Sequence, residues 1–510
     1  MKREIRKLLF SIGLMCVAVL AAGMLATAQE YGGTLIVGVS DEVTQLDPHF
    51  TSQQAHGIMI ARNVFNGLLK TNPAWEVEPD LAERWEVSAD GLTWTFYLRE
   101  GVRFHNGELF TAEDVKFSLE RLIDPESGST HAGAFDPNMT VAIVDDYTVT
   151  ITLSAPDADL LDTLAGPSMA MVPKSVVEAY GNLNEIVVGT GPFYLAERRA
   201  DVKTVLARNP EYFEDGLPYL DRIEFRIIQD DTARLVALRM GEVHFIDRVP
   251  WQMIEAMESA QGVRAVGGAG INLRIMSPNI NREPWDDPLV RQAFYMGLNK
   301  QEIVDVVLAG YGEALLGGVI PSTLTGHNPN ACYPDGDVDG AKALLAQAGY
   351  PDGFTTKLLT FGDIQIYVDY AQIVREQAKK FGITVELELL ELGIVQARRA
   401  AQDFDLVGAG IGGLTNSHSF IANTYGAASS RNFNGYTDPV IEDLLAQSKA
   451  ATSTEEREQI LIDMQELLCE SMPVFPLFNG YTHWGISEKL KGWEFNPGYV
   501  QYFGYVWLED

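Results

Sequence analysis

The stretch FHNGELFTAEDVKFSLERL, residues 104–122, places one histidine among several acids. His105 is followed by Glu108, Glu113, Asp114 and Glu120. Such a set can bind a metal ion or transfer protons in acid–base catalysis. It can equally belong to a turn and a well-capped helix. The elements that position these residues decide between the two interpretations.

The surrounding residues favour the structural interpretation. Thr111, followed three positions later by Asp114, is the pattern of a helix N-cap with an acid in the first turn. Apolar residues then recur along one helical face, at Val115, Leu119 and Leu122. His105 precedes the turn dipeptide Asn106-Gly107, and no second histidine or cysteine stands at a ligand spacing. We therefore predict a loop and a capped amphipathic helix here, with no metal.

The glycine-rich run GAGIGG, residues 408–413, is a second candidate motif. It formally matches the Gly-x-Gly-x-x-Gly pattern of dinucleotide sites and follows a predicted strand at 404–407. Such sites open a helix directly after the glycines, and the following LTNSHSF does not have the pattern of a helix start. We predict a glycine-rich loop beside a ligand, and no dinucleotide cofactor.

Other enzyme motifs are absent from the sequence. It contains neither a Walker-type phosphate loop nor a Gly-x-Ser-x-Gly elbow, and its eight histidines lack the spacing of metalloproteases. We therefore expect no enzyme, no cofactor and no catalytic residues. A secreted hydrolase whose catalytic groups come from distant segments stays the alternative from another class.

The N-terminus has the pattern of a secretory signal. The basic start MKREIRK leads into an apolar run at 8–25 and then Ala26-Thr27-Ala28 before Gln29. We predict export to the periplasm and cleavage of residues 1–28, with an uncleaved anchor as the alternative because the run is long enough to span a bilayer. Cys16 lies inside the run without a lipoprotein-type ending, so we expect no lipid anchor and no stable membrane insertion after cleavage.

Beyond the signal, Cys332 and Cys469 are the two remaining cysteines, and neither belongs to a Cys-x-x-Cys motif. In an oxidising compartment they can form a disulfide, whereas two buried free thiols fit the sequence equally well. Spacing alone leaves both alternatives open.

Length and charge restrict the function classes. A chain of 510 residues is long enough for two to four domains. Its net charge of −32 repels phosphate backbones and anionic lipid headgroups. We therefore expect no nucleic-acid partner and no function at a membrane surface.

The pattern of elements changes along the chain. Residues 84–98 and 141–153 alternate apolar and polar side chains about short turns, which predicts two β-hairpins within a strand-rich region at about 72–188. From about 220 the pattern becomes strand then helix, which predicts an α/β fold. Helix starts are expected at Asp231, Asp287-Pro288, Asn299, Asp438-Pro439 and Ser453.

Residues 79–122, PDLAERWEVSADGLTWTFYLREGVRFHNGELFTAEDVKFSLERL, resemble the signature region of the family 5 extracellular solute-binding proteins. This family, the peptide/nickel/oligosaccharide class, serves ABC importers. Further family-like stretches follow in order and cover most of the chain: GTGPFYLAE at 189–197, the run at 208–243, PWDDPLVRQAFYMGLNKQEIV at 284–304, AKALLAQAGYPDGF at 341–354 and MPVFPLF at 472–478.

The resemblance implies an α/β fold of the periplasmic-binding-protein type, with two lobes and a hinge. Lobe 1 would combine an α/β domain with an inserted strand-rich domain, and the chain would cross between lobes near 271–277 and 480–485. The expected domains are 29–71, 189–270 and 485–510 for the α/β part of lobe 1, 72–188 for the insertion and 271–484 for lobe 2. The function implied is capture of a small solute and delivery to ABC permease subunits, by a monomer; coupling to a chemoreceptor is compatible with the same fold.

The resemblance also implies which segments line the ligand cleft. They are the segment after the first strand, the loop at 127–135, the position around Ser168-Met169, and the loop at 411–420. The residues of this sequence at those positions are Glu42, Thr44, His131, Phe135, Met169, Ile411, Asn416 and His418. Three aromatic residues, Phe135, Trp251 and Tyr425, offer stacking against a sugar or aromatic ring, although packing explains each of them as well.

One departure from the family concerns the ligand. Peptide-binding relatives usually have an aromatic residue and an Asp in the loop at 411–420, and the Asp pairs with the α-ammonium of a peptide. This sequence has no acid between Asp405 and Asp438, and a buried unpaired ammonium would cost several kcal/mol. We therefore expect a non-peptide organic solute, with di- or oligopeptides as the alternative and a metal complex third; Glu42 or Asp41 offers a substitute carboxylate. His131 and His418, from opposite lobes, could together hold a metal complex, a carboxylate or a sugar hydroxyl.

Overall fold

The structure is a computed structural model that describes residues 29–50, 55–129, 131–412, 416–451, 453–496 and 501–509. The predicted signal peptide, residues 1–28, lies outside the described residues. Within the described part of the chain, none of the helices combines the length and the apolar character that crossing a bilayer requires.

One large mixed sheet runs through the molecule in the order β15-β14-β16-β12-β17-β11-β1-β10-β9-β8, with β13 paired to β17. Its strands are β1 Thr34–Val39, β8 Phe193–Arg199, β9 Lys203–Arg208, β10 Arg222–Ile227, β11 Phe245–Ile246, β12 Val263–Pro278, β13 Gly312–Ala314, β14 Phe354–Phe361, β15 Ile383–Leu390, β16 Leu406–Gly412 and β17 Phe475–Ser487. Both the parallel pairs, such as β1 with β10, and the antiparallel pairs, such as β12 with β17, are present.

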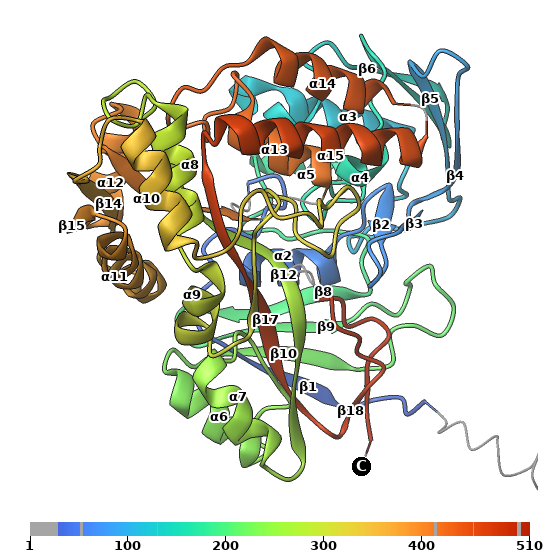
Figure 1. The fold of residues 1–510 in the computed structure, drawn as a ribbon. Helices are drawn as coiled ribbons and strands as arrows, with labels where there is room; N and C mark the ends of the chain where they lie inside the picture. The colour runs from blue at the N-terminus through green and yellow to red at the C-terminus, as the bar shows by residue number, and fades with distance from the viewer. Residues whose placement is uncertain are drawn as a thin grey trace, which may run out of the picture.

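The two longest strands join the halves of the molecule. β12 and β17 pair antiparallel along most of their length, and Figure 1 shows them running through its centre. The register shifts between Ala269 and Leu273, where the ladder is irregular. The crossovers expected near 271–277 and 480–485 fall within these two strands, while the domain boundaries stay predictions.

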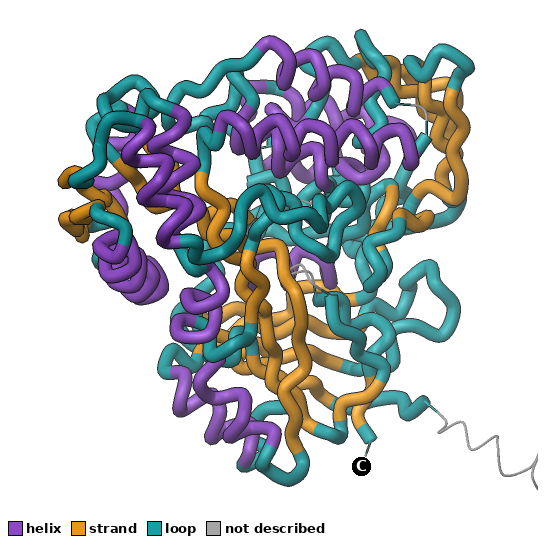
Figure 2. The backbone as a smooth tube through the Cα atoms, viewed as in Figure 1, coloured by secondary structure: helices purple, strands orange, loops and turns teal. Residues whose placement is uncertain are grey.

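The helices lie mainly around the half of the molecule that carries β14 and β15, and on the side of the four-stranded sheet (Figure 2). Their bounds are α2 Ala55–Val64, α3 Ala112–Ile123, α4 Leu160–Leu164, α5 Lys174–Tyr180, α6 Asp231–Arg239, α7 Trp251–Glu258, α8 Pro288–Gly297, α9 Lys300–Val307, α10 Val338–Gln347, α11 Gln365–Lys380, α12 Leu392–Ala400, α13 Ser417–Tyr425, α14 Pro439–Ala450 and α15 Thr454–Ser471. The predicted starts of α6, α8, α9, α14 and α15 are confirmed. A side chain caps each of them: Asp230, Asp287, Asn299, Asp438 and Ser453.

Both predicted hairpins are confirmed and belong to a four-stranded antiparallel sheet, β4-β5-β7-β6. Its strands are β4 Ala82–Val87, β5 Thr93–Leu98, β6 Thr140–Asp145 and β7 Thr148–Thr152. The inward residues Phe96, Val149 and Ile151 are fully buried and share one core with Val115 and Leu119 of α3. Two small sheets, β2 Leu69–Thr71 with β3 Val77–Pro79 and β18 Leu490–Lys491 with β19 Trp507–Leu508, complete the strands. The α/β fold class is confirmed.

The glycine-rich run does not form the predicted loop. Residues up to Gly412 belong to strand β16, whose backbone pairs antiparallel with β12. The prediction was wrong because glycine weakens an isolated strand, whereas here a neighbouring strand supplies the hydrogen bonds. The glycines also let side chains approach the strand closely, since a Cβ at Gly408 would meet the hydroxyl groups of Tyr370 and Thr360.

A helix does begin in the segment that lacked a predicted helix start. The Asn416 side chain accepts a hydrogen bond of 2.8 Å from the backbone N–H of Ser419 and caps α13. Asn is one of the best N-cap residues, so the signal was present and the prediction missed it. Residues 413–415 lie outside the described residues.

Cys332 and Cys469 form a disulfide, with their Cα atoms 5.3 Å apart. The bond ties the segment before α10 to α15 across a sequence separation of 137 residues. It decides between the two alternatives that the sequence left open.

Candidate ligand-binding site

The first candidate cluster is a structural element. The Nε2 atom of His105 lies 3.0 Å from the carbonyl oxygen of Gly191, and its Nδ1 accepts from the N–H of Gly189 at 3.2 Å. Burial lowers the pKa of His105 to about 4, which keeps the ring neutral. Asp114 accepts from the backbone N–H groups of Thr111 and Lys174, at 3.0 and 3.1 Å. The predicted loop and capped helix are confirmed.

No metal site is evident in the parts of the chain that the structure describes. There, His, Cys, Asp and Glu side chains form no group of three or more that could hold a metal ion. The histidines expected to act together have different neighbours. The Nδ1 atom of His418 lies 2.6 Å from the hydroxyl of Ser448 on α14, and burial lowers the pKa of His418 to about 4. His131 instead interacts electrostatically with His49.

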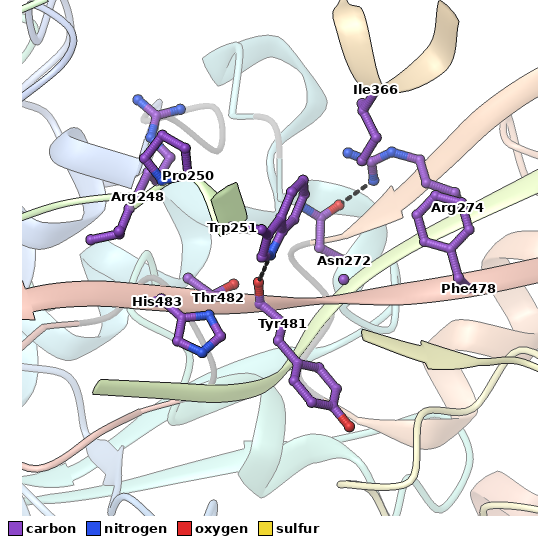
Figure 3. A pocket seen from close by; sticks show the side chains of 12 residues that line it. Arg248, Pro250, Trp251, Asn272, Arg274, Ile366, Phe478, Tyr481, Thr482 and His483 are labelled. Atoms are coloured by element: carbon purple, nitrogen blue, oxygen red, sulfur yellow. Dashed lines mark hydrogen bonds between the residues drawn. The ribbon is translucent and has the colours of Figure 1, made fainter. Parts of the chain in front are cut away.

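A cavity of about 220 Å³ lies where the long strands pass from one half of the molecule to the other. The turn after β11 and the start of α7 form one wall, β12 and β17 form the floor, and α11 contributes one residue (Figure 3). The lining residues are Arg248, Val249, Pro250, Trp251, Asn272, Arg274, Ile366, Phe478, Gly480, Tyr481, Thr482 and His483.

The aromatic wall of this cavity is held by a hydrogen bond. The indole Nε1 of Trp251 donates to the carbonyl oxygen of Tyr481, 2.7 Å away, which fixes the ring against β17 (Figure 3). Trp251 is the first residue of α7, directly after Pro250. Because an aromatic ring and a polar edge are typical of ligand pockets, Trp251 offers a stacking surface.

A network of charges supports the opposite edge. Arg248 has a left-handed backbone with φ of 46° and pairs with Asp41 at 2.5 Å and with the buried Asp247 at 3.1 Å. Its Nη2 also donates to the hydroxyl of Ser40. The turn after β1 is thereby tied to the cavity edge, and the Asp41 carboxylate is already paired.

The residues predicted in the first half of the chain have other neighbours. Glu42 pairs with Arg198 at 3.0 Å and accepts from the backbone of Asp201. Thr44 is exposed, His131 is half-buried, and Phe135 and Met169 are buried in the large core.

Those predicted in the second half also lie away from the cavity lining. Ile411 is buried in the core on the face of β16 opposite to Gly410, Asn416 caps α13, and His418 contacts Ser448. Tyr425, a candidate for stacking, belongs to the same core as Ile411. None of the eight predicted residues lines the cavity, and without a bound solute they stay predictions.

Sequence reasoning missed Arg248, Arg274 and Tyr481 as cavity residues and weighed Trp251 only as a stacking candidate. One signal was available. The expected crossovers at 271–277 and 480–485 contain six of the lining residues: Asn272, Arg274, Gly480, Tyr481, Thr482 and His483.

A second contact joins segments far apart in sequence. Lys449 at the end of α14 pairs with Asp157 at 3.1 Å, and Arg457 of α15 pairs with Asp159 beside α4. The N–H of Ala158 also donates to the carbonyl oxygen of Lys449, at 2.8 Å. These contacts hold α14 and α15 against the segment before α4.

Comparison with known proteins places the chain in a family. Residues 76–433 match the model of the bacterial extracellular solute-binding proteins, family 5. The glutathione-binding protein GsiB of Salmonella typhimurium is 31% identical over 371 residues, which is 72% of this chain and 71% of that protein.

Solved structures agree with that match. The periplasmic binding protein AgaA from A. tumefaciens R10, in complex with agropinic acid, has a TM-score of 0.80 at 27% identity and covers 94% of this chain and 99% of that one. The periplasmic binding protein DppA from Helicobacter pylori, in complex with the peptide STSA, has a TM-score of 0.79 at 27% identity, with the same coverage. The protein therefore has the two-lobed fold of periplasmic binding proteins, and the chain belongs to the family 5 bacterial extracellular solute-binding proteins.

Proposed function

We propose that this protein is the periplasmic substrate-binding subunit of an ABC importer, which captures a small organic solute between two lobes and delivers it to the permease without chemical turnover. The observation that carries the proposal is the cavity at the crossover strands, because both proposed lobes line it. Arg248 and Trp251 belong to proposed lobe 1, whereas Arg274 and Ile366 belong to proposed lobe 2. A solute in this cavity would contact both lobes at once.

Contacts to both lobes give a mechanism for capture. A ligand that touches both lobes binds the closed arrangement better than an open one and so shifts the population towards it. The irregular ladder between Ala269 and Leu273 offers the place where β12 can bend. The ion pairs of Lys449 with Asp157 and of Arg457 with Asp159 connect proposed lobe 2 to the inserted domain, so they favour closure.

The cavity supports a non-peptide solute. Its lining contains two arginines and no acid, so no carboxylate there would pair with the α-ammonium of a peptide. The two acids that the sequence offered as substitutes are already paired, Asp41 with Arg248 and Glu42 with Arg198. A volume of about 220 Å³ is also small beside the roughly 300–1,000 Å³ typical of pockets for drug-sized ligands. Di- or oligopeptides are the alternative, since one relative holds a peptide.

Native mass spectrometry of the purified protein, followed by thermal-shift measurements with peptides, oligosaccharides, organic acids and nickel complexes, tests this function. We expect one stoichiometric solute or one stabilising class, with micromolar or tighter affinity, equivalent to about 8 kcal/mol or more. Stabilisation by ordinary peptides would overturn the non-peptide assignment. Consumption of a compound by the purified protein would instead favour the hydrolase.

A further inference from the structure

Three arginines without an acidic partner surround the end of β16, and we call Arg274, Arg399 and Arg431 the arginine cluster. Arg274, on β12, lies opposite Gly410 in the strand ladder. Arg431 donates from Nη1 to the carbonyl oxygen of Gly412 at 3.5 Å. Two of the three guanidinium groups therefore lie along the last residues of β16.

Tyr367 of α11 connects the third arginine to the other two. The guanidinium of Arg274 lies 5.1 Å from the centre of the Tyr367 ring. Arg399 interacts electrostatically with both Tyr367 and Arg431, and its guanidinium stacks over Phe433 at 3.5 Å. The members of the cluster thus share neighbours, and Arg274 also lines the cavity.

Glycine makes room for this arrangement. A Cβ at Gly410 would lie 3.2 Å from Nη1 of Arg274 and close to the hydroxyl of Tyr367. A side chain at this position of the strand would therefore push into the cluster. The glycines of β16, which resemble a nucleotide motif in the sequence, instead clear space for arginine and tyrosine side chains.

Among the described residues, the other buried or half-buried arginines pair with an acid, except Arg291, which donates to backbone carbonyl groups as Arg274 also does. Arg121, for example, pairs with Asp47 at 2.7 Å, and Arg457 pairs with Asp159. Within the described residues, no member of the arginine cluster forms an ion pair. The Nε atoms of Arg274 and Arg399 are buried without an acceptor there; Arg234 and Arg457 share this feature but form ion pairs through their other nitrogen atoms. Acids are not scarce, because the chain has 70 of them against 38 basic residues.

An unoccupied cluster of this kind is unfavourable. Burial lowers the pKa of Arg431 and of Arg399, and the neighbouring charge of Arg431 lowers that of Arg399 further. A guanidinium nevertheless keeps its proton in proteins, so the charges of Arg399 and Arg431 persist and repel each other. An incoming anion relieves the repulsion and fills the missing hydrogen bonds at the same time.

Resting on the proposed function, we propose that the arginine cluster binds the anionic oxygens of the solute, and that the solute is a small organic acid whose carboxylate faces the end of β16. The planar guanidinium matches a carboxylate with two parallel hydrogen bonds, which gives direction as well as affinity. Because Arg274 also lines the cavity, the remainder of the solute would extend towards Trp251. A phosphate ester offers the same chemistry, and the experiment separates the two.

The test uses the full mature protein, unfolded and refolded to remove any co-purified solute, in isothermal titration and thermal-shift measurements. The probes are glutathione, its diethyl ester, succinate, mannopinic acid, glycerol 2-phosphate and maltose. The variants are Arg274→Gln and Arg431→Gln, with Arg375→Gln as the matched control, since Arg375 is 45% exposed on α11 and pairs only with its neighbour Glu376. Any solute that co-purifies with the untreated protein is identified by native mass spectrometry.

We expect free carboxylates to be required. At least one carboxylate probe, or an acidic co-purified solute, should bind the wild type and Arg375→Gln alike and bind both cluster variants at least about tenfold more weakly. Binding of glycerol 2-phosphate alone would keep the anion site but overturn the carboxylate. Tight binding of a neutral compound, unchanged in the cluster variants, would overturn the anion site while leaving solute capture intact. If the wild type binds no probe and carries no solute, the proposed function fails and the anion site fails with it.

Discussion

Two groups of basic side chains differ in what neutralises them. Around Asp247, the side chains of Arg234, Arg248 and His56 all face one fully buried carboxylate, with His56 at 2.7 Å, Arg248 at 3.1 Å and Arg234 at 3.5 Å. Around the end of β16, the arginine cluster faces no carboxylate among the described residues. The first group is complete within the chain, whereas the second would be completed by a molecule from outside.

His418 shows another way in which a protein can bury a basic side chain. His418 is buried beside Ser448 with Lys449 nearby, and burial lowers its pKa to about 4. A histidine can thus escape the cost of burial by losing its proton. Arginine lacks this option, so an arginine without an acid keeps its charge and its demand for an anion.

The largest effect is expected when the complete group is broken. In Asp247→Asn, Arg234 and Arg248 lose their shared anion in a buried site, so the free energy of unfolding should fall by about 3–5 kcal/mol. Urea-induced unfolding followed by circular dichroism measures this change. Asp403→Asn is the matched control: Asp403 is 59% exposed and pairs with Arg282 and Arg398, so the loss should stay within about 1 kcal/mol. An Asp247→Asn variant as stable as this control would show that the buried carboxylate does not balance the arginines.

Local sequence patterns predicted those parts of the fold that depend on neighbours in the chain. The hairpins at 84–98 and 141–153 follow from alternation, and the starts of α9 and α15 follow from Asn299 and Ser453 as N-caps. The strand predicted at 404–407 is present as the start of β16, but its glycine-rich continuation at 408–412 was missed because glycines signal a loop, and pairing with β12 makes that part a strand.

The candidate site was harder to predict because it is assembled from strands and helices that are distant in the sequence. Arg274 alternates with core residues in β12 and has no local motif around it. Arg274 stands out only in the folded protein, because within the described residues its guanidinium donates to an amide and a carbonyl oxygen and no acid from a neighbouring element pairs with it. The absence of an acid between Asp405 and Asp438 was visible in the sequence, but the positions of the arginines beside this segment were not.

A smaller effect is expected for His418 and should depend on pH. Its pKa is about 6.5 in the unfolded chain and about 4 in the folded protein, so its contribution to stability is present above pH 6.5 and is lost as the pH falls towards 4. The wild type should therefore lose about 2–3 kcal/mol more than His418→Gln between pH 7.5 and pH 4.5. Urea unfolding of both proteins at the two pH values measures the difference. Equal losses would mean that His418 is not a neutral buried group, and the contrast with arginine would lose its basis.

The smallest expected change in the free energy of unfolding has the opposite sign. That sign distinguishes the arginine cluster from the group around Asp247 most directly. Arg431→Gln in the ligand-free protein removes a charge that repels Arg399, while the new amide can still donate to the carbonyl oxygen of Gly412. The free energy of unfolding should therefore stay unchanged or rise by up to about 1 kcal/mol, measured by urea unfolding after removal of bound solute. Arg457→Gln serves as the comparison, because it removes the partner of the buried Asp159 and should lower stability. A fall for Arg431→Gln as large as that for Arg457→Gln would mean that the fold itself depends on this charge. If Arg431→Gln is as stable as the wild type or more stable, and also binds the solute more weakly, then the charge of Arg431 serves the ligand at the expense of stability.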